Sequence, residues 1–516
     1  MRRRLSALLL LCALLSAGLA PAGAEAPAPL SGAVYQVFVP SFYDADGDGV
    51  GDLRGIAEKI PYIQALGARG LWLTPVSPSP SYHGYDVTDY TGINPRLGTL
   101  SDYRELAARC DGADLYLLFD LVLNHSSSEH PWFRSALQSL TREPCGQAAC
   151  AAPDLCRAHN PYVNYYLFSQ NGQGHPAPGA PGWSYYGHFG PHMPDFNLDD
   201  PGLRADIADI ARFWLSQGAD GFRLDAVIHF YEENNAKNAA FLAWFAGVVR
   251  EERPDAFLVA EAWKDANTIL ALYRTGLDAL FNFPFSGADG AIAKALREAD
   301  GAGLARKAAE WQNRVAAARP GAADAPFLSN HDTGRSAGFL RMDPRRMKLA
   351  AAVYLLLPGV PFVYYGEELG MTGSGRDENK RLPMLWSLAD PEGSCLPPEG
   401  ADQAQRLKAA ADTQEGDPDS LLGFYRGVLA LRNRAPALAR GHAQALDLGA
   451  PGVLAFRAGE GAGANLVVAN LGAKPVTLPA FPGAVFLGGW DTGFGAPAPE
   501  GDTLVLPPYS GCVFQE

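Results

Sequence analysis

The sequence predicts an α/β fold, because strand-like and helical runs alternate along most of its 516 residues. This alternation stops between about 124 and 199, and short alternating apolar runs replace it after about 439. Several of the strand-like runs end in a carboxylate. Together these observations predict a (β/α)8 TIM barrel with an inserted small domain after strand 3 and a C-terminal antiparallel β-sandwich.

Eight strand-like runs are expected to form the barrel. They span residues 33–42, 70–76, 114–122, 220–226, 257–262, 278–284, 325–330 and 361–365. Residues 200–218 have acids near their start and a periodic apolar face, which predicts a helix, and another is expected at 419–434.

The stretch from 124 to 199 is rich in Gly, Pro, His and aromatic residues and is too long for an ordinary βα loop. It is therefore expected to form the inserted domain, beside a barrel of residues 25–123 and 200–438. Residues 439–516 would form the sandwich.

Residues 1–24 have the pattern of a signal peptide: three arginines, a short apolar run, and Ala22-Gly23-Ala24 as a cleavage site. The chain is therefore expected to be exported, to the periplasm or the outside of the cell, with Glu25 at the mature N-terminus. No small residue precedes Cys12 as a lipoprotein anchor requires, and no later apolar run reaches the roughly 20 residues of a membrane helix. No membrane anchor is expected after cleavage.

The chain is acidic. Its formal net charge is −14, and removal of the three leader arginines, with no acid, makes it −17. Because such a surface repels phosphate backbones, nucleic acid is excluded as an expected partner.

Six cysteines follow the leader: Cys110, Cys145, Cys150, Cys156, Cys395 and Cys512. The cluster CGQAACAAPDLC at 145–156 favours one disulfide in an oxidising compartment. A zinc site is the alternative, but the spacing is not C-x-x-C and no histidine pair accompanies it. Cys110, near the end of a predicted helix, is expected to be a small buried residue.

Three segments bring carboxylates to expected strand ends: Asp225, Glu261 and Asp332. Such residues converge on one rim of a barrel, and paired carboxyl groups there suggest cleavage of a glycosidic bond. Any one of them alone would more often be a helix cap. Arg223, two residues before Asp225, would keep that carboxylate ionised, and His331 offers a donor beside Asp332 that suits sugar hydroxyls.

These segments resemble the signatures of the α-amylase superfamily, glycoside hydrolase family 13, in unbroken order from about 33 to about 370. The four main ones are DLVLNH at 120–125, GFRLDAVIH at 221–229, LVAEAW at 258–263 and FLSNHD at 327–332. The lesser ones are GLWLTP at 70–75, MPDFN at 193–197 and GVPFVYYGEELG at 359–370. The resemblance implies a retaining mechanism in which Asp225 attacks, Glu261 is the acid and base, and Asp332 binds ring hydroxyls.

The resemblance also implies a set of substrate-binding residues. They are His83, Tyr85, His125, Arg223, His229 and His331. Ile228 replaces a lysine that often precedes the histidine matched by His229. Asn124 matches one ligand position of a second family calcium site, for which no acidic partners are identified. The aromatic residues of GWSYYGHFG at 182–190 are expected in the core of the insert, with stacking on sugars as the alternative.

The loop DADGDGVGD at 44–52 repeats the first half of an EF-hand calcium loop, with Gly55 in place of its closing glutamate. Asp44, Asp46, Asp48, Asp52 and the carbonyl of Val50 are therefore expected to bind calcium. This pattern resembles the loop site of oligo-1,6-glucosidase-like members. A solvated acidic turn is the alternative.

Substrate choice depends on SYHGYDVTDY at 81–90. Exo-acting family members carry a pocket-closing aspartate three residues before the platform tyrosine, where this chain has Tyr82. DENKRLPMLW at 377–386, however, is similar to a glucosidase stretch, so the chain resembles the intermediate group of secreted or periplasmic α-amylases.

The expected activity is retaining endo-hydrolysis of α-1,4-glucosidic bonds in starch, glycogen or maltooligosaccharides, by a monomer. An exo-acting α-glucosidase, an oligo-1,6-glucosidase or a transglycosylase is the first alternative. A non-catalytic binding or scaffold relative is the second.

Overall fold

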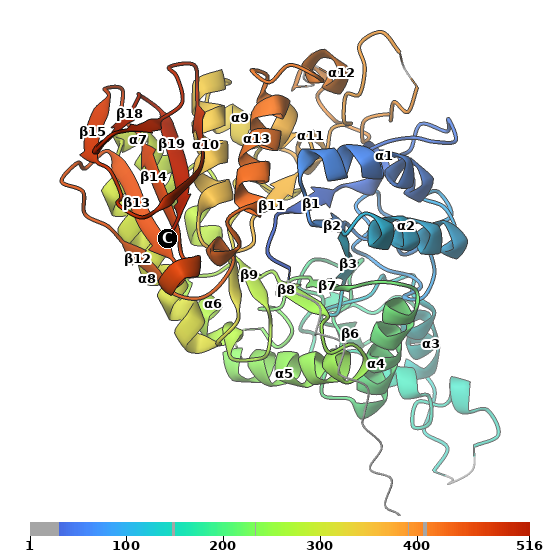
Figure 1. Cartoon of the computed structure of the whole chain (residues 1–516). Helices are drawn as coiled ribbons and strands as arrows, with labels where there is room; N and C mark the ends of the chain where they lie inside the picture. Colours follow the sequence, from blue (N-terminus) through green and yellow to red (C-terminus); the bar gives the residue numbers. More distant parts are fainter. Residues whose placement is uncertain (1–29, 147–149, 233, 391, 406–409) are drawn as a thin grey trace, which may run out of the picture.

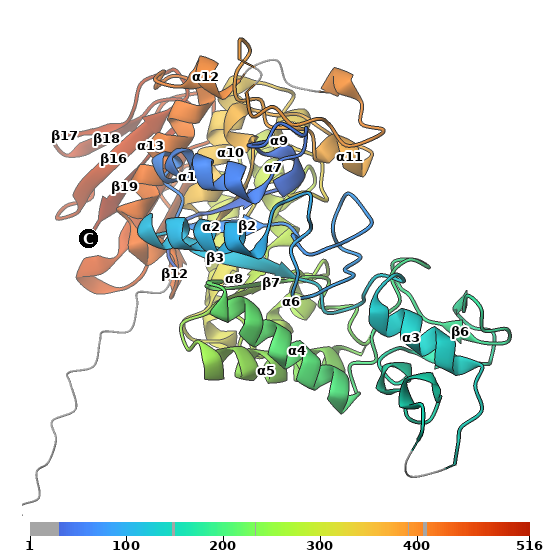
Figure 2. The same cartoon turned by 90° about the vertical axis from the view of Figure 1, so that its right-hand side faces the viewer.

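The computed structural model describes residues 30–146, 150–232, 234–390, 392–405 and 410–516 (Figure 1). The expected signal peptide at 1–24 lies outside the described residues. The chain forms a barrel, an insert beside it and a C-terminal pair of sheets (Figures 1 and 2). This architecture confirms the predicted fold class.

Eight parallel strands form the barrel sheet, in the order β10-β9-β8-β7-β3-β2-β1-β11. Their bounds are β1 Val34–Val37, β2 Gly70–Leu73, β3 Tyr116–Leu121, β7 Gly221–Leu224, β8 Phe257–Ala260, β9 Ala279–Phe281, β10 Ala323–Ala325 and β11 Phe362–Tyr364. A parallel bridge between Phe327 and Phe362 brings the two ends of the sheet together. Buried Trp72, Phe281 and other apolar side chains fill the interior, so open space for a ligand lies at the rim.

The seventh strand does not lie where the sequence predicts it. A strand is expected at 325–330, but β10 ends at Ala325. Pro326, which has no N–H to donate to a ladder, follows directly, and only Phe327 then makes a bridge. Asp332 therefore lies in a loop beyond the strand, not at its end.

Helices cover the outside of the barrel. The longer ones are α1 Leu53–Leu66, α2 Leu100–Gly112, α4 Pro201–Ser216, α5 Asn235–Glu252, α6 Ala266–Tyr273, α7 Ala291–Glu298, α8 Gly301–Ala318, α10 Pro344–Leu356 and α13 Leu421–Asn433, with short α9 Ser336–Phe339, α11 Asp377–Lys380 and α12 Ala411–Gln414.

The predicted helix at 200–218 is confirmed as α4. The Asp200 side chain accepts a hydrogen bond from the Leu203 N–H and so caps the helix, with Pro201 at the first helical position. Cys110 is buried near the end of α2, as predicted. In the described part of the chain, no helix combines the length and apolar character that crossing a membrane requires.

The insert follows β3. It contains α3 Pro131–Leu140 and three strands of two residues each, β4 Phe168–Ser169, β5 His175–Pro176 and β6 Ser184–Tyr185, in the order β4-β6-β5. His125 and Asp195 form an antiparallel bridge, so the two ends of the insert run side by side. Figure 2 shows the insert projecting from one side of the barrel.

The C-terminal part consists of two antiparallel sheets, ordered β12-β13-β14-β19-β16 and β15-β18-β17. The strands are β12 Ala443–Ala445, β13 Val453–Ala458, β14 Asn465–Asn470, β15 Val476–Pro479, β16 Val485–Asp491, β17 Ala498–Glu500, β18 Thr503–Leu506 and β19 Ser510–Gln515. Alternate residues such as Leu466 and Val468 on β14 pack against Leu504 and Leu506 on β18, which forms a core between the sheets. The first sheet lies against α8 (Figure 1).

Candidate active site

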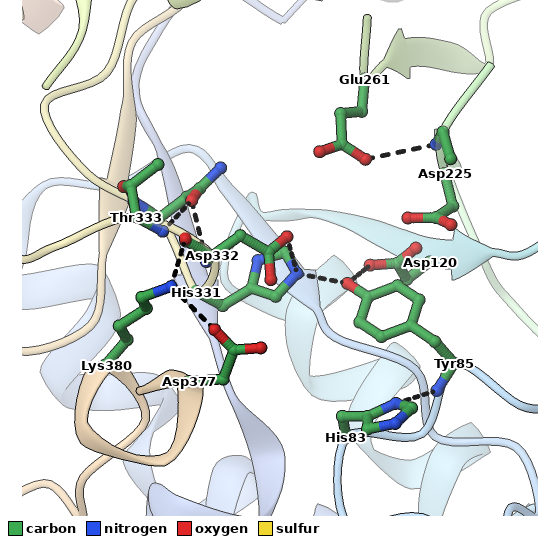
Figure 3. Close-up of polar contacts among 12 residues, drawn as sticks. His83, Tyr85, Asp120, Asp225, Glu261, His331, Asp332, Thr333, Asp377 and Lys380 are labelled. Carbon is green, nitrogen blue, oxygen red and sulfur yellow. Dashed lines mark hydrogen bonds and ion pairs between the residues drawn. The ribbon is translucent and has the colours of Figure 1, made fainter. Parts of the chain in front are cut away.

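The three predicted acids meet at one cavity of about 340 Å³. Asp225 directly follows β7, Glu261 directly follows β8, and Asp332 reaches the cavity from the loop after β10 (Figure 3). The cavity is lined by His83, Tyr85, His125, Phe189, Met193, Asp225, Ala226, Ile228, His229, Glu261, Trp263, Asp332, Asp377 and Arg381. It therefore lies between the C-terminal ends of the strands and the insert, which supplies His125, Phe189 and Met193.

Arg223 holds the acids from behind the cavity wall. Its fully buried guanidinium donates from Nη1 to Asp120 Oδ1 at 2.8 Å and to Asp225 Oδ1 at 2.6 Å, and from Nη2 to Glu261 Oε2 at 2.8 Å. The backbone N–H of Ala226, at a left-handed φ of 46°, also donates to Glu261 Oε2, at 3.2 Å. One planar cation thus fixes the orientation of two of the three predicted acids.

Burial raises the pKa of both Asp225 and Glu261, but to different values. It raises the pKa of Asp225 to about 6, against the opposing effect of Arg223. It raises the pKa of Glu261 to about 7, against Arg223 and with the like charges of Asp225 and Asp332 adding to the shift. Desolvation by burial is the largest cause of the shift at Glu261. Near neutrality Asp225 is mainly ionised while much of Glu261 keeps its proton.

Asp332 is held differently. Arg381 Nη2 donates to its Oδ1 at 2.8 Å, and His331 Nε2 lies 3.0 Å from its Oδ2. Burial alone would raise the pKa of Asp332, but His331 and Arg381 outweigh it, so the pKa lies well below its ordinary value. Asp332 is therefore an ionised acceptor that cannot supply a proton.

Tyr85 stacks on His331, with ring centroids 5.5 Å apart and planes inclined by 11° (Figure 3). Its hydroxyl lies 2.6 Å from His331 Nε2 and donates to Asp120 Oδ2 at 3.1 Å. The Gln36 amide N lies 2.7 Å from His331 Nδ1. A donor at Nδ1 places the ring proton on Nε2, and burial lowers the pKa of His331, which makes it the neutral donor that the sequence predicts.

Two further predicted histidines line the cavity. His83 Nδ1 accepts from the Tyr85 backbone N–H at 3.1 Å, so its proton lies on Nε2. Burial lowers the pKa of His125 to about 3. Within the described ranges, His125 Nε2 is buried without a hydrogen-bond partner, as expected of a group kept for a ligand.

The other end of the cavity is aromatic. His229 stacks on His188 at 3.9 Å and meets the edge of Phe189 at 5.3 Å. Burial lowers the pKa of His229 to about 4, with His188 adding to the shift. Trp263, 54% exposed, stacks on Phe283. Flat, partly exposed rings of this kind suit the faces of pyranose rings.

Sequence reasoning missed several of these residues. Phe189 lies within GWSYYGHFG and Trp263 within LVAEAW, but neither motif identified them as cavity residues. Asp120 lies near the end of an expected strand, and this position could have identified it. Arg381 lies within DENKRLPMLW, the stretch similar to a glucosidase sequence, but no local pattern shows that it reaches the cavity from a loop 49 residues beyond Asp332. The core prediction for GWSYYGHFG is confirmed for Tyr185, which is buried against Phe133.

The predicted calcium loop brings three of its four aspartates together. One carboxylate oxygen from each of Asp44, Asp46 and Asp48 lies within 4.8 Å of the others. Asp52 is not in this group. Its Oδ1 accepts from the Gly55 N–H and caps α1, and its Oδ2 accepts from the Ala45 N–H. The three grouped carboxylates fit the oxygen-only chemistry of calcium, whereas Asp52 fits a helix cap.

Comparison with known proteins agrees with this geometry. Residues 36–441 match the family described as alpha amylase, catalytic domain, and residues 441–513 match a domain of unknown function, DUF3459. The chain is 36% identical over 432 residues to Alpha-amylase 3 of Dictyoglomus thermophilum, covering 82% of this chain and 81% of the relative. It is 32% identical over 518 residues to the Trehalose synthase/amylase TreS of Mycobacterium tuberculosis, covering 86% and 81%.

Among solved structures, that of Eubacterium rectale Amy13B superposes with a TM-score of 0.88 at 36% identity, covering 95% of this chain and 96% of that one. The family match spans the barrel and all three acids of the cavity, so the resemblance drawn from the sequence motifs is confirmed. The chain belongs to the α-amylase family and is a glycoside hydrolase.

Proposed function

We propose that the chain is an α-amylase, which cleaves internal α-1,4-glucosidic bonds of starch, glycogen or maltooligosaccharides with retention of configuration. One observation carries this proposal: Asp225 and Glu261 share the guanidinium of Arg223 at the wall of a single cavity. A shared guanidinium keeps the two carboxyl groups near each other, which suits the short spacing of retaining enzymes.

The contacts support a separate role for each carboxylate oxygen. Asp225 Oδ1 and Glu261 Oε2 are held by Arg223, so Asp225 Oδ2 attacks the anomeric carbon and Glu261 Oε1 carries the proton. In the first step the bond from Asp225 forms, the glycosidic bond breaks, and the departing oxygen takes that proton. In the second, Glu261 takes a proton from water, whose oxygen displaces Asp225.

The remaining groups hold the sugar. Ionised Asp332 accepts hydrogen bonds from ring hydroxyls, while neutral His83 and His125 offer N–H donors. His331 does not line the cavity, and its N–H faces Asp332 and holds that acceptor in place. Tyr85 forms the platform beneath the ring, and His229 lies toward the leaving-group side.

Endo action is supported by the group that replaces the closing aspartate. Tyr82, 38% exposed, accepts a hydrogen bond from Arg381 Nη1 at 2.9 Å and so lies beside the Asp332 end of the cavity. A neutral ring there adds no charge across the path of a glucan and offers a face on which a further sugar unit can pack.

The rival activity is transfer to a sugar, or removal of single glucose units. It is favoured by the similarity to the Mycobacterium relative, whose name combines trehalose synthase with amylase. The products of maltoheptaose, followed over time by chromatography and by NMR of the new reducing ends, separate these activities. Short α-configured oligosaccharides at the earliest times support the proposal. Glucose alone, longer chains or trehalose as the first product would contradict it.

Calcium binding and export complete the proposal. Asp44, Asp46 and Asp48, with the carbonyl of Val50, would hold calcium between β1 and α1, and the ion would stabilise this loop. Residues 1–24 would direct the chain across a membrane. N-terminal sequencing of the protein recovered outside the cytoplasm tests the cleavage after Ala24.

A further inference from the structure

A second group of metal-ligating side chains lies in the insert, apart from the cavity. The sulfurs of Cys145, Cys150 and Cys156 and a ring nitrogen of His159 all lie within 4.8 Å of one another. His159 Nδ1 is 3.3 Å from Cys156 Sγ and 3.5 Å from Cys145 Sγ. None of these residues lines the substrate cavity.

Local structure places His159 beside the cysteines. A short helical turn, Pro153–Leu155, ends at Cys156, and the N–H groups of His159 and Asn160 both donate to the Cys156 carbonyl. The buried Asn160 amide then donates to Ser139 Oγ of α3 and to the Asp154 carbonyl. These bonds fix the turn against α3, so His159 faces the sulfurs as part of an ordered segment.

The separations suit one tetrahedral ion. Zinc–sulfur bonds of about 2.3 Å and zinc–nitrogen bonds of about 2.0 Å, set at the tetrahedral angle, put sulfur and nitrogen about 3.5 Å apart. The two measured separations, 3.3 and 3.5 Å, are close to this value. Thiolate and imidazole ligands select zinc over the hard cations that suit the aspartate loop.

We propose that Cys145, Cys150, Cys156 and His159 bind one zinc ion in a closed, structural site. Four protein ligands complete a tetrahedral shell, so no position is left for a water or substrate. Each coordinating cysteine loses its thiol proton to solvent when the ion binds.

The site would stabilise a part of the molecule with little regular structure. The three strands of the insert have two residues each, and α3 is its only helix of more than one turn among the described residues. A small body of this kind gains stability from a metal that joins distant segments. Here the ion would join Cys145 to the segment that carries Cys150, Cys156 and His159, which is held against α3 through Asn160.

A disulfide is the competing use of these cysteines. Cys150 and Cys156 are thiols in the structure. A disulfide between any two of the three cysteines would leave the third sulfur and His159 with no common ligand. Zinc uses all four groups. Since bound thiolates are shielded from oxidants, the site is compatible with an exported protein.

The first test is the metal content of the full chain, recovered from its own export route and dialysed against metal-free buffer. Mass spectrometry of the metals should find one zinc per chain. Cys145→Ser, at an exposed position that leaves the core unchanged, should lose it, as should His159→Gln. Cys110→Ala, which changes a buried cysteine of the barrel, should keep it.

The second test replaces zinc by cobalt, whose visible absorption reports tetrahedral thiolate coordination. The wild-type chain should show these bands, and Cys145→Ser should weaken and shift them. Chelation should lower the melting temperature of the wild-type chain, and added zinc should restore it.

Two results would overturn the proposal. One is a chain that, reduced and given equimolar zinc, retains none after dialysis. The other is an exported chain in which peptide mapping finds a disulfide between two cysteines of the cluster.

Discussion

Asp225 and Glu261 share one guanidinium, yet the proposed reaction requires the first to attack and the second to carry a proton. Their pKa values separate these roles, because the pKa of about 7 of Glu261 lies above the pKa of about 6 of Asp225. The hydrogen bonds of Arg223 orient both groups before a substrate arrives, and such pre-organisation lowers the free energy needed to reach the transition state.

Asp225→Asn should lower kcat by several orders of magnitude, because an amide cannot form the covalent intermediate. Substrate binding should change little, since Asn keeps the shape and one acceptor for Arg223. Initial rates on soluble starch and calorimetric binding of maltoheptaose measure the two effects. A variant that keeps a tenth of the wild-type rate would contradict the assigned role.

The pH dependence of kcat/KM should be bell-shaped. Below a pKa of about 6 Asp225 gains a proton and cannot attack, and above about 7 Glu261 loses its proton and cannot assist the leaving oxygen. Because the two groups are close, the limbs report the pair. An aryl maltoside, whose leaving group departs without a proton, should lose most of the alkaline limb. Identical profiles for the two substrates would count against Glu261 as the acid.

Tyr82→Asp should shift preference toward short substrates. Arg381 Nη1 lies 2.9 Å from the Tyr82 hydroxyl and would pair with the new carboxylate. The aspartate would then compete with Asp332 for Arg381 and close the cavity beyond the first sugar. The ratio of kcat/KM for amylose to that for maltotriose should fall, while Tyr82→Phe should leave it nearly unchanged. An equal ratio in all three proteins would assign endo action to another loop.

The loop between β1 and α1 assigns two different roles to two of its aspartates, Asp46 and Asp52. Asp46 belongs to the group proposed to hold calcium, whereas Asp52 caps α1. Removing each should therefore have separable effects on the stability of the same element.

Asp46→Ala should abolish the dependence of the melting temperature on calcium, because the ion stabilises the folded state only when it binds. Asp52→Ala should cost about 1 kcal/mol through the lost cap but keep a response to calcium. Thermal unfolding after chelation, followed by addition of calcium or zinc, measures both. If calcium raises the melting temperature of Asp46→Ala as much as that of wild type, the loop does not bind it.

The sequence predicted the barrel and the three acids because apolar runs and charged strand ends are local patterns. It misplaced β10, because a proline inside an apolar run shortens a strand without changing its hydrophobicity. It missed Arg381, and it placed zinc second to a disulfide because it looked for a histidine pair, whereas the single His159 lies three residues after Cys156. Which distant side chains meet depends on loop paths, which periodicity does not encode.

The barrel and the C-terminal sheets are joined through polar contacts as well as apolar packing. Asn313 of α8 donates from its side chain to the Ala443 carbonyl at 2.8 Å and accepts from the Ala443 N–H at 2.9 Å. These two hydrogen bonds link strand β12 to helix α8, so the barrel and the C-terminal sheets are expected to unfold together.

Asn313→Ala should lower the free energy of unfolding by about 1–3 kcal/mol, because it leaves two backbone groups without their partner. Arg314→Ala, at the next position of α8, should change it by less than about 0.5 kcal/mol. Urea unfolding followed by fluorescence gives both values. Two separate transitions in the wild-type chain would show that the junction does not couple the parts.

The bridge between His125 and Asp195 brings the entry and exit of the insert together at one point of the barrel rim. Because the two ends of the insert already lie together, a change in the length of the chain between them adds little to the entropy cost of closing this loop. The part of the insert between these residues can therefore be replaced by another sequence, while the eight strands and the contacts of Arg223 with its carboxylate partners stay in place. The insert supplies Phe189 and Met193 to the cavity. Replacing the insert would therefore change one wall of the substrate site, and with it the substrate preference, while the acids on the barrel side stay the same.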